Sequence, residues 1–130
     1  MPIKTGEFLL QTEPADRIYF FGPFNRVSQR ELKITNNTRY AVAWKVKTTD
    51  NRVVKIQPPA GILQIGESTS VNLSTGPWGP QPPPEPQFVT VMNIPADAMT
   101  AEAREAWRQN KGPETGSGNM KFDVTFGQEQ

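Results

Sequence analysis

The sequence predicts an all-β fold: a sandwich of seven short strands, with one short helix near the C-terminus. Three observations lead to this prediction. The chain has 130 residues, enough for a single domain with a core of its own. Its 13 prolines and 10 glycines divide it into short segments, as is typical of turn-rich proteins. Between these breaks, apolar and polar residues alternate with the period of two that indicates half-buried strands.

The first half of the chain contains four predicted strands. Residues 1–6 are expected to form a flexible arm, within an extended segment that ends in a turn at 13–16. Strands are predicted over residues 18–21, 31–35, 41–48 and 53–56. Asp50 and Asn51 favour a turn, so 53–56 is expected to pair with the strand before it.

The strand over 41–48 shows the clearest alternation. Its core face is predicted to carry Val42, Trp44 and Val46. Its opposite face is predicted to carry Ala43, Lys45 and Lys47. Trp44 is therefore assigned a structural role inside the sandwich.

Prolines shape the middle of the chain. Pro58 and Pro59 are assigned a structural role, because proline cannot donate a ladder hydrogen bond, and their corner contains either a cis peptide bond or two trans bonds. Residues 76–86 (GPWGPQPPPEP) predict a Pro-rich polyproline II loop. This loop is either a rigid surface segment or a ligand for a proline-binding domain. Within it, Trp78 either anchors an interface or folds back onto the sandwich.

The second half completes the predicted sandwich. Strands are expected over residues 68–74, 88–94 and 121–126. A helix is predicted from an N-cap at Thr100 to the residue before Gly112, with Trp107 packed on the sheet in a structural role. Residues 112–119 form a Gly/Ser-rich loop. Seven evenly spaced strands in one domain, residues 1–130, favour an immunoglobulin-like β-sandwich.

Composition excludes several kinds of chemistry. The chain has no cysteine and no histidine, which excludes disulfides, thiol nucleophiles, Cys/His zinc sites and histidine-based acid–base catalysis. No other catalytic constellation is visible, so neither an enzyme nor a bound metal or cofactor is expected. The sequence shows no signal-peptide pattern and no apolar run near the ~18 residues of a membrane span. A cytoplasmic location is therefore expected.

Charge is distributed unevenly. The net charge is +1, but residues 26–55 carry eight basic and two acidic side chains, whereas residues 56–130 carry four basic and eight acidic ones. This asymmetry favours contacts with other proteins. Nucleic acid is not expected as a partner, because the net charge is small and no RNA-binding motif is present.

Lys33, Lys45, Lys47 and Thr48 are the candidate binding residues. If the apolar residues beside them face the core, the three lysines are expected to share the solvent-facing side of one sheet. Such a face suits an acidic peptide or an acidic patch on another subunit. The alternative is a solvated face whose charges prevent aggregation of strand edges.

Several segments resemble the major sperm protein (MSP) domain family. Residues 31–36 (ELKITN), 44–49 (WKVKTT) and 58–63 (PPAGIL) match its motifs in order. Residues 93–98 (NIPADA) and 104–110 (REAWRQN) are similar to the end of the nematode sperm proteins. The resemblance covers about residues 7–127. It implies an MSP/PapD-like immunoglobulin fold, no catalytic activity, and a role in assembly or adaptor binding.

The resemblance implies two functional hypotheses. The first is a cytoplasmic protein of nematode amoeboid sperm, located in the cytoskeleton of the pseudopod. It would be either a filament subunit or an accessory regulator of filament assembly. Its partners would be other MSP-domain proteins or itself, as a homodimer.

The second hypothesis is an adaptor domain like that of the VAP proteins. These bind acidic peptides with paired phenylalanines (FFAT motifs) on a basic sheet face. The resemblance implies that part of the grip comes from a Lys-x-Met pair on the strand aligned with Phe88. In this chain Gln87 and Val89 occupy those positions, which counts against the second hypothesis.

Overall fold

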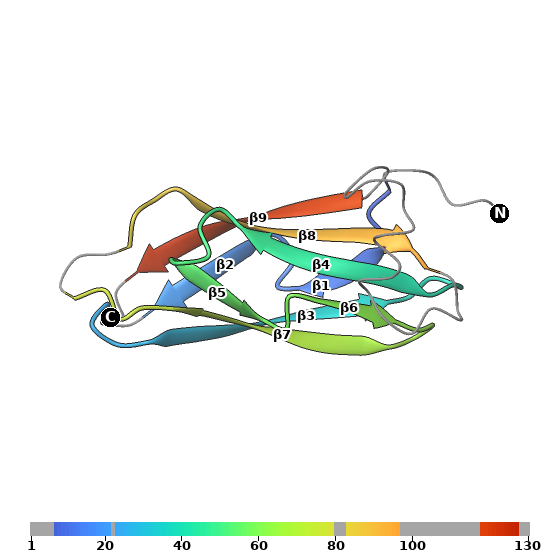
Figure 1. Cartoon of the computed structure of the whole chain (residues 1–130), viewed down its shortest axis with the longest axis horizontal. Helices are drawn as coiled ribbons and strands as arrows, with labels where there is room; N and C mark the ends of the chain where they lie inside the picture. Colours follow the sequence, from blue (N-terminus) through green and yellow to red (C-terminus); the bar gives the residue numbers. More distant parts are fainter. Residues whose placement is uncertain (1–6, 22, 80–82, 97–117, 128–130) are drawn as a thin grey trace.

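The structure is a computed structural model that describes residues 7–21, 23–79, 83–96 and 118–127. The described residues form two facing β-sheets (Figure 1). Their nine strands are β1 (Leu10–Glu13), β2 (Arg17–Phe21), β3 (Ser28–Asn36), β4 (Val42–Thr48), β5 (Val54–Gln57), β6 (Ala60–Leu63), β7 (Ser68–Thr75), β8 (Gln87–Pro95) and β9 (Gly118–Gly127).

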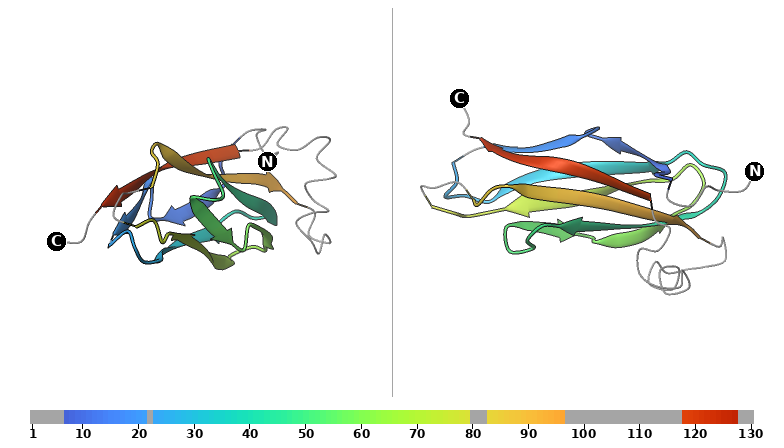
Figure 2. Two further views of the ribbon diagram at one scale, coloured as in Figure 1. Left: turned by 60° about the vertical axis from the view of Figure 1, so that its left-hand side comes forward. Right: turned by 90° about the horizontal axis from the view of Figure 1, so that it is seen from above.

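One sheet has four strands and the other has five. The four-stranded sheet has the order β1-β3-β7-β5, and the five-stranded sheet has the order β2-β9-β8-β4-β6. Strand β2 runs parallel to β9, and β9 is antiparallel to β8 (Figure 2, right). The predicted all-β sandwich is therefore confirmed.

The predicted number of strands is wrong, because β1 and β6 are additional. Strand β1 lies in the expected N-terminal extended segment, where it pairs with the edge of β3 and buries Leu10. Strand β6 follows the two prolines and pairs with β4. Proline lacks a donor but keeps its carbonyl, and the Pro59 oxygen accepts a hydrogen bond from the Val46 N–H at 2.8 Å. Hydrogen bonding to β4 therefore begins at Pro59, directly before β6.

The predicted partner of residues 53–56 is also wrong. Strand β5 pairs with β7 in the four-stranded sheet, whereas β4 lies in the five-stranded sheet. The chain returns to the five-stranded sheet between Gln57 and Ala60, and the Gln57–Pro58 bond is the cis one of the corner. Alternation of apolar residues cannot distinguish these pairings, because either sheet would bury the same face of β5.

Some predictions fall outside the described residues. The helix expected from Thr100, with Trp107, lies there, and the described residues contain no helix. Residues 118 and 119, predicted as the end of a loop, instead begin β9. Gly118 is buried against the backbone of Glu7, where a Cβ would overlap the Glu7 carbonyl oxygen, so the position requires glycine. Among the described residues, no helix is long and apolar enough to cross a membrane.

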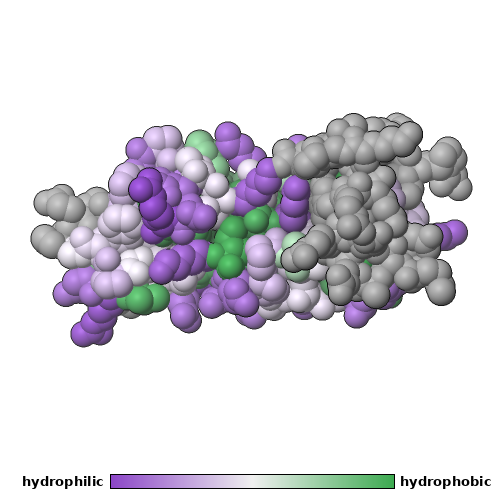
Figure 3. Space-filling view, in the orientation of Figure 1, coloured by the Kyte–Doolittle hydropathy of each residue, from purple (hydrophilic) through white to green (hydrophobic). Residues whose placement is uncertain are grey.

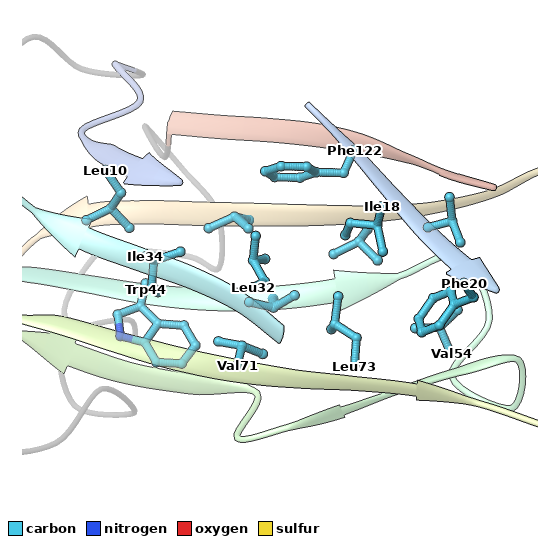
Figure 4. Close-up of a cluster of buried hydrophobic side chains, with 14 of the residues drawn as sticks. Leu10, Ile18, Phe20, Leu32, Ile34, Trp44, Val54, Val71, Leu73 and Phe122 are labelled. Carbon is cyan, nitrogen blue, oxygen red and sulfur yellow. The ribbon is translucent and has the colours of Figure 1, made fainter. Parts of the chain in front are cut away.

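The core fills the space between the two sheets (Figure 4). Trp44 is 2% exposed and contributes the largest side chain, which confirms its predicted place. The other members of this cluster are branched aliphatic and phenylalanine side chains from both sheets: Leu10, Ile18, Phe20, Leu32, Ile34, Val42, Val46, Val53, Val54, Leu63, Val71, Leu73, Val89, Val91, Phe122, Val124 and Phe126.

A second apolar cluster lies on the outer face of the five-stranded sheet. It consists of Ala43, Met92 and Ile94, with Ile62 and Ala96 packed against them. Ala43 is thus buried, although alternation placed it on the solvent face with the lysines. On the side shown in Figure 3, hydrophilic side chains surround a small apolar area near the centre.

Candidate functional site

The outer face of the five-stranded sheet gathers lysines from two strands. Lys47 on β4 lies opposite Thr90 on β8, and Thr90 lies opposite Lys121 on β9. In the next row, Lys45 lies opposite Met92, which lies opposite Asn119. We call the surface formed by Lys45, Lys47, Lys121, Phe88, Thr90 and Met92 the basic face. A shallow groove of about 360 Å³ runs over most of it.

Phe88 lies beside these lysines with its ring under a positive charge. The Lys121 Nζ atom is 3.8 Å from the centre of the Phe88 ring, a cation–π contact. Phe88 is half-buried, so one part of its ring remains accessible. The basic face therefore offers positive charge and aromatic surface at one place.

The lysines of β4 are partly desolvated. Burial lowers the pKa of Lys45, and burial together with the charge of Lys45 lowers the pKa of Lys47. Both shifts mean that the charged forms are less favourable here than in water. A bound anion would compensate both effects.

Thr48 lines the groove over the basic face, but its hydroxyl does not face outward. Its hydroxyl points to the inner side and donates to the Val54 carbonyl at 3.4 Å. Thr49 takes the outward position: its hydroxyl accepts from the Phe88 N–H at 2.9 Å, and its own N–H donates to the Phe88 carbonyl at 3.1 Å. The period of two that places Lys45 and Lys47 outside would have placed Thr48 inside.

Lys33 lies away from the other two lysines, so the prediction that all three share one sheet face is wrong. Lys33 is on β3 in the four-stranded sheet, where its cross-strand neighbours are Glu13 and Ser70. Lys121 takes the third position on the basic face. Sequence reasoning missed Lys121, although it alternates with the buried Phe122 and Val124, because the pairing of β9 with β8 was not predicted.

Gln87 and Val89 face the core and cannot contact a ligand. They are 6% and 0% exposed, and the Gln87 side-chain amide donates to the Pro84 carbonyl at 3.0 Å. The outward positions of β8 are Phe88 and Thr90. The two positions that the resemblance assigns to the Lys-x-Met pair thus face inward in this chain.

Trp78 folds back onto the sandwich, the second of its two predicted alternatives. Its indole N–H donates to the Thr75 hydroxyl at 3.0 Å, and its backbone N–H donates to the Phe24 carbonyl at 2.5 Å. The ring is half-buried against the core.

An acidic residue beside the basic face has its own partner. Asp50, in the turn after β4, accepts hydrogen bonds from the Arg52 guanidinium at 3.1 and 3.0 Å. These bonds lower the pKa of Asp50. Asp50 therefore already has a cationic partner in its own turn.

These features define a class: a β-sandwich that exposes a basic, partly aromatic face on one sheet. Residues 9–113 match the MSP (Major sperm protein) domain, and the chain belongs to this family. It is 35% identical to vesicle-associated membrane protein-associated protein B of Sus scrofa over 108 residues, 81% of this chain and 44% of that protein.

Two further comparisons agree with this family. Major sperm protein isoform beta of Ascaris suum is 32% identical over 65 residues, 50% of this chain and 51% of that protein. The solved structure of WR4, a C. elegans MSP family member, has a TM-score of 0.71 at 14% identity and covers 91% of this chain and 97% of that one. This last likeness concerns the fold. The chain spans about half the length of the curated relatives it matches.

Proposed function

We propose that this chain is a non-enzymatic adaptor domain that binds acidic linear peptides on its basic face. The observation that carries the proposal is the pair Lys47 and Lys121 on either side of Thr90, with Lys121 over the half-buried Phe88 ring and Lys45 one row further along β4. Ammonium groups attract and orient carboxylates, and the ring offers apolar contact to an aromatic side chain. A peptide with acidic residues around paired phenylalanines meets both requirements.

The comparisons favour this adaptor hypothesis over the sperm-filament hypothesis. The match to vesicle-associated membrane protein-associated protein B covers 81% of the chain, whereas the match to the Ascaris sperm protein covers 50%. The resemblance to the VAP proteins is what implies binding of short acidic peptides. A cytoplasmic location remains part of this proposal.

Fluorescence anisotropy with a labelled acidic, phenylalanine-containing peptide tests the proposal. We expect the unmodified chain to bind and Lys47→Glu to weaken binding by about tenfold or more, since charge is reversed at the centre of the site. Lys55→Glu is the matched control, because Lys55 is exposed on β5 of the other sheet. Absence of binding, or an equal loss in both variants, would contradict the proposal.

A second candidate function is that of a sperm filament subunit or assembly regulator. Its support is the partial identity to Major sperm protein isoform beta. As such, the chain would associate with itself or with other MSP-domain proteins. Sedimentation velocity over a range of concentrations, with electron microscopy, tests this function, and a strict monomer that neither forms fibres nor alters their growth would exclude it.

A further inference from the structure

Two aromatic side chains lie exposed on β2, at the edge of the five-stranded sheet. Tyr19 is 40% exposed and Phe21 is 48% exposed. Their rings are stacked, with centres 5.7 Å apart and an angle of 4° between the planes. We call this pair the aromatic ledge. Adjacent exposed aromatic residues of this kind are characteristic of interaction surfaces.

Two arginines lie beside the aromatic ledge. The Arg17 guanidinium is 5.9 Å from the Tyr19 ring centre, and that of Arg30 is 5.3 Å from the Phe21 ring centre. Arg30 comes from β3 in the other sheet, and its Nε donates to the Tyr19 carbonyl at 2.6 Å. The ledge is thus apolar surface flanked by Arg30 and by Arg17, and Arg17 also forms an ion pair with Asp123 at 3.8 Å. This composition suits an aromatic side chain that has a carboxylate next to it.

The aromatic ledge and the basic face belong to the same side of the sheet. Tyr19 lies beside Thr125, and Phe21 lies beside Gly127. On β9, Thr125 and Gly127 face the same outer side of the sheet as Lys121, because an even number of residues separates them. Asp123 points outward between Lys121 and Thr125, and its carboxylate lies 3.8 Å from the Arg17 guanidinium. Beyond Asp123, Thr125 is small and Gly127 has no side chain, so nothing covers the ledge from β9. Four to six residues of strand separate Lys121 from the ledge, about 13 to 20 Å. An extended peptide of similar length spans this distance.

The backbone edge of β2 is less suited to adding another strand. The Tyr19 and Phe21 carbonyls accept hydrogen bonds from the Arg30 guanidinium and the Ser28 hydroxyl, at 2.6 and 3.0 Å. An added strand would have to displace these side chains. A ligand is therefore expected to lie on the face of the sheet, over the rings.

We propose that the aromatic ledge is a second subsite for the acidic peptide that the basic face binds. The ledge binds an aromatic side chain of the peptide that has a carboxylate next to it and lies four to six residues from the peptide's acidic segment. The proposal rests on the proposed function. It adds a requirement for spacing and for a second aromatic residue, which makes this domain selective among acidic peptides.

Three synthetic peptides test this subsite. The first is an acidic segment with paired phenylalanines. The second adds a Phe-Asp pair five residues away from the acidic segment, and it is made in two forms, with the extension at the N-terminal or at the C-terminal end. The third is the same as the second, except that alanine replaces the added phenylalanine. In one of the two forms we expect the phenylalanine extension to bind about tenfold more tightly than the alanine extension, as burial of one such side chain implies. The NMR amide signals of Thr125 and Gly127 should shift only with the phenylalanine extension.

Variants separate this subsite from the basic face. Tyr19→Ser and Phe21→Ser should each abolish the tenfold gain while the short peptide binds as before, since both side chains are exposed. Ile65→Ser is the control, because Ile65 is 63% exposed in the turn between β6 and β7. Lys47→Glu should weaken all three peptides.

The outcomes distinguish the two proposals. If the short peptide does not bind, the proposed function is wrong. If the short peptide binds but the phenylalanine extension brings no gain, the aromatic ledge is not a subsite. Concentration-dependent dimerisation that Phe21→Ser abolishes would also overturn the proposal, because the ledge would then be covered by a second copy of the chain.

Discussion

The indole of Trp44 lies directly against the backbone of Gly61. A Cβ at Gly61 would be 2.8 Å from Cζ2 of Trp44, closer than such atoms approach. Gly61 is on β6 opposite Trp44 on β4, so the glycine makes room for the largest core side chain. The MSP-like segment 58–63 thus contains a glycine that the core requires.

Gly61→Ala should therefore destabilise the fold by about 1 to 3 kcal/mol through overpacking. Urea unfolding followed by tryptophan fluorescence measures this loss. In a double-mutant cycle, Trp44→Phe should reduce the cost of Gly61→Ala, because the smaller ring leaves room for a methyl group. Additive effects of the two substitutions would show that the contact does not matter.

Asn36 should be among the most sensitive positions of the chain. It is fully buried, and its side-chain amide donates to the carbonyls of Tyr40, Leu63 and Gln64 at 2.9, 3.0 and 3.2 Å. Asn36→Ala leaves buried carbonyls without donors, at an expected cost of about 3 kcal/mol. Thermal unfolding measures the loss, with the exposed Asn72→Ala as control. Equal melting temperatures of the Asn36→Ala and Asn72→Ala variants would contradict the structural role of Asn36.

Asn93 should hold the N-terminal segment on the sandwich. Its side-chain oxygen accepts from the Leu9 N–H at 2.8 Å, and its nitrogen donates to the Glu7 carbonyl at 3.0 Å. Asn93→Ala removes both bonds, so the Leu9 amide should exchange with solvent much faster. Hydrogen exchange measured by NMR checks this, and core amides of β7 serve as the internal reference. Unchanged protection at Leu9 would count against the role of Asn93.

As the pH is raised, peptide affinity should begin to fall at a lower pH than it would if Lys45 and Lys47 had ordinary pKa values. The pKa values of Lys45 and Lys47 are lowered from the usual 10.5, mainly by burial. Acidic ligands bind the protonated forms, so affinity is full near neutral pH and decreases as pH rises through these lowered values. Anisotropy titrations from about pH 7 to about pH 10.5 measure the profile.

Arginine substitutions provide the control for this pH dependence. Lys45→Arg with Lys47→Arg keeps the positive charge throughout the same range, because the guanidinium stays protonated. The decrease in affinity should then move to higher pH. The same profile in both proteins would indicate that other groups cause the decrease.

Local patterns predicted the strands well but not their partners. Alternation and short apolar runs between turn residues located seven strands, and alternation gave the inward side of β4, because burial of one face imposes a period of two. Alternation could not show that β5 pairs with β7 in the four-stranded sheet, or that the Pro59 carbonyl still accepts a hydrogen bond from β4. Those outcomes depend on pairing between distant segments, which no local pattern contains.

The candidate site was predicted only in part for the same reason. Lys45 and Lys47 share a strand, so their common face follows from the sequence alone. Lys33 and Lys121 depend on which strands are neighbours, and the first was wrongly included while the second was missed. The inward direction of Gln87 could have been found by extending the alternation of β8 backward from Val91.

The separation of Lys33 from the other lysines has a practical consequence. The outer face of the four-stranded sheet carries small polar residues such as Ser70 and Asn72 on β7, and the chain has no cysteine. A thiol introduced by Ser70→Cys would therefore be the sole attachment point for a thiol-reactive dye or sensor chip. A molecule immobilised there would turn its lysine-rich side toward the solution.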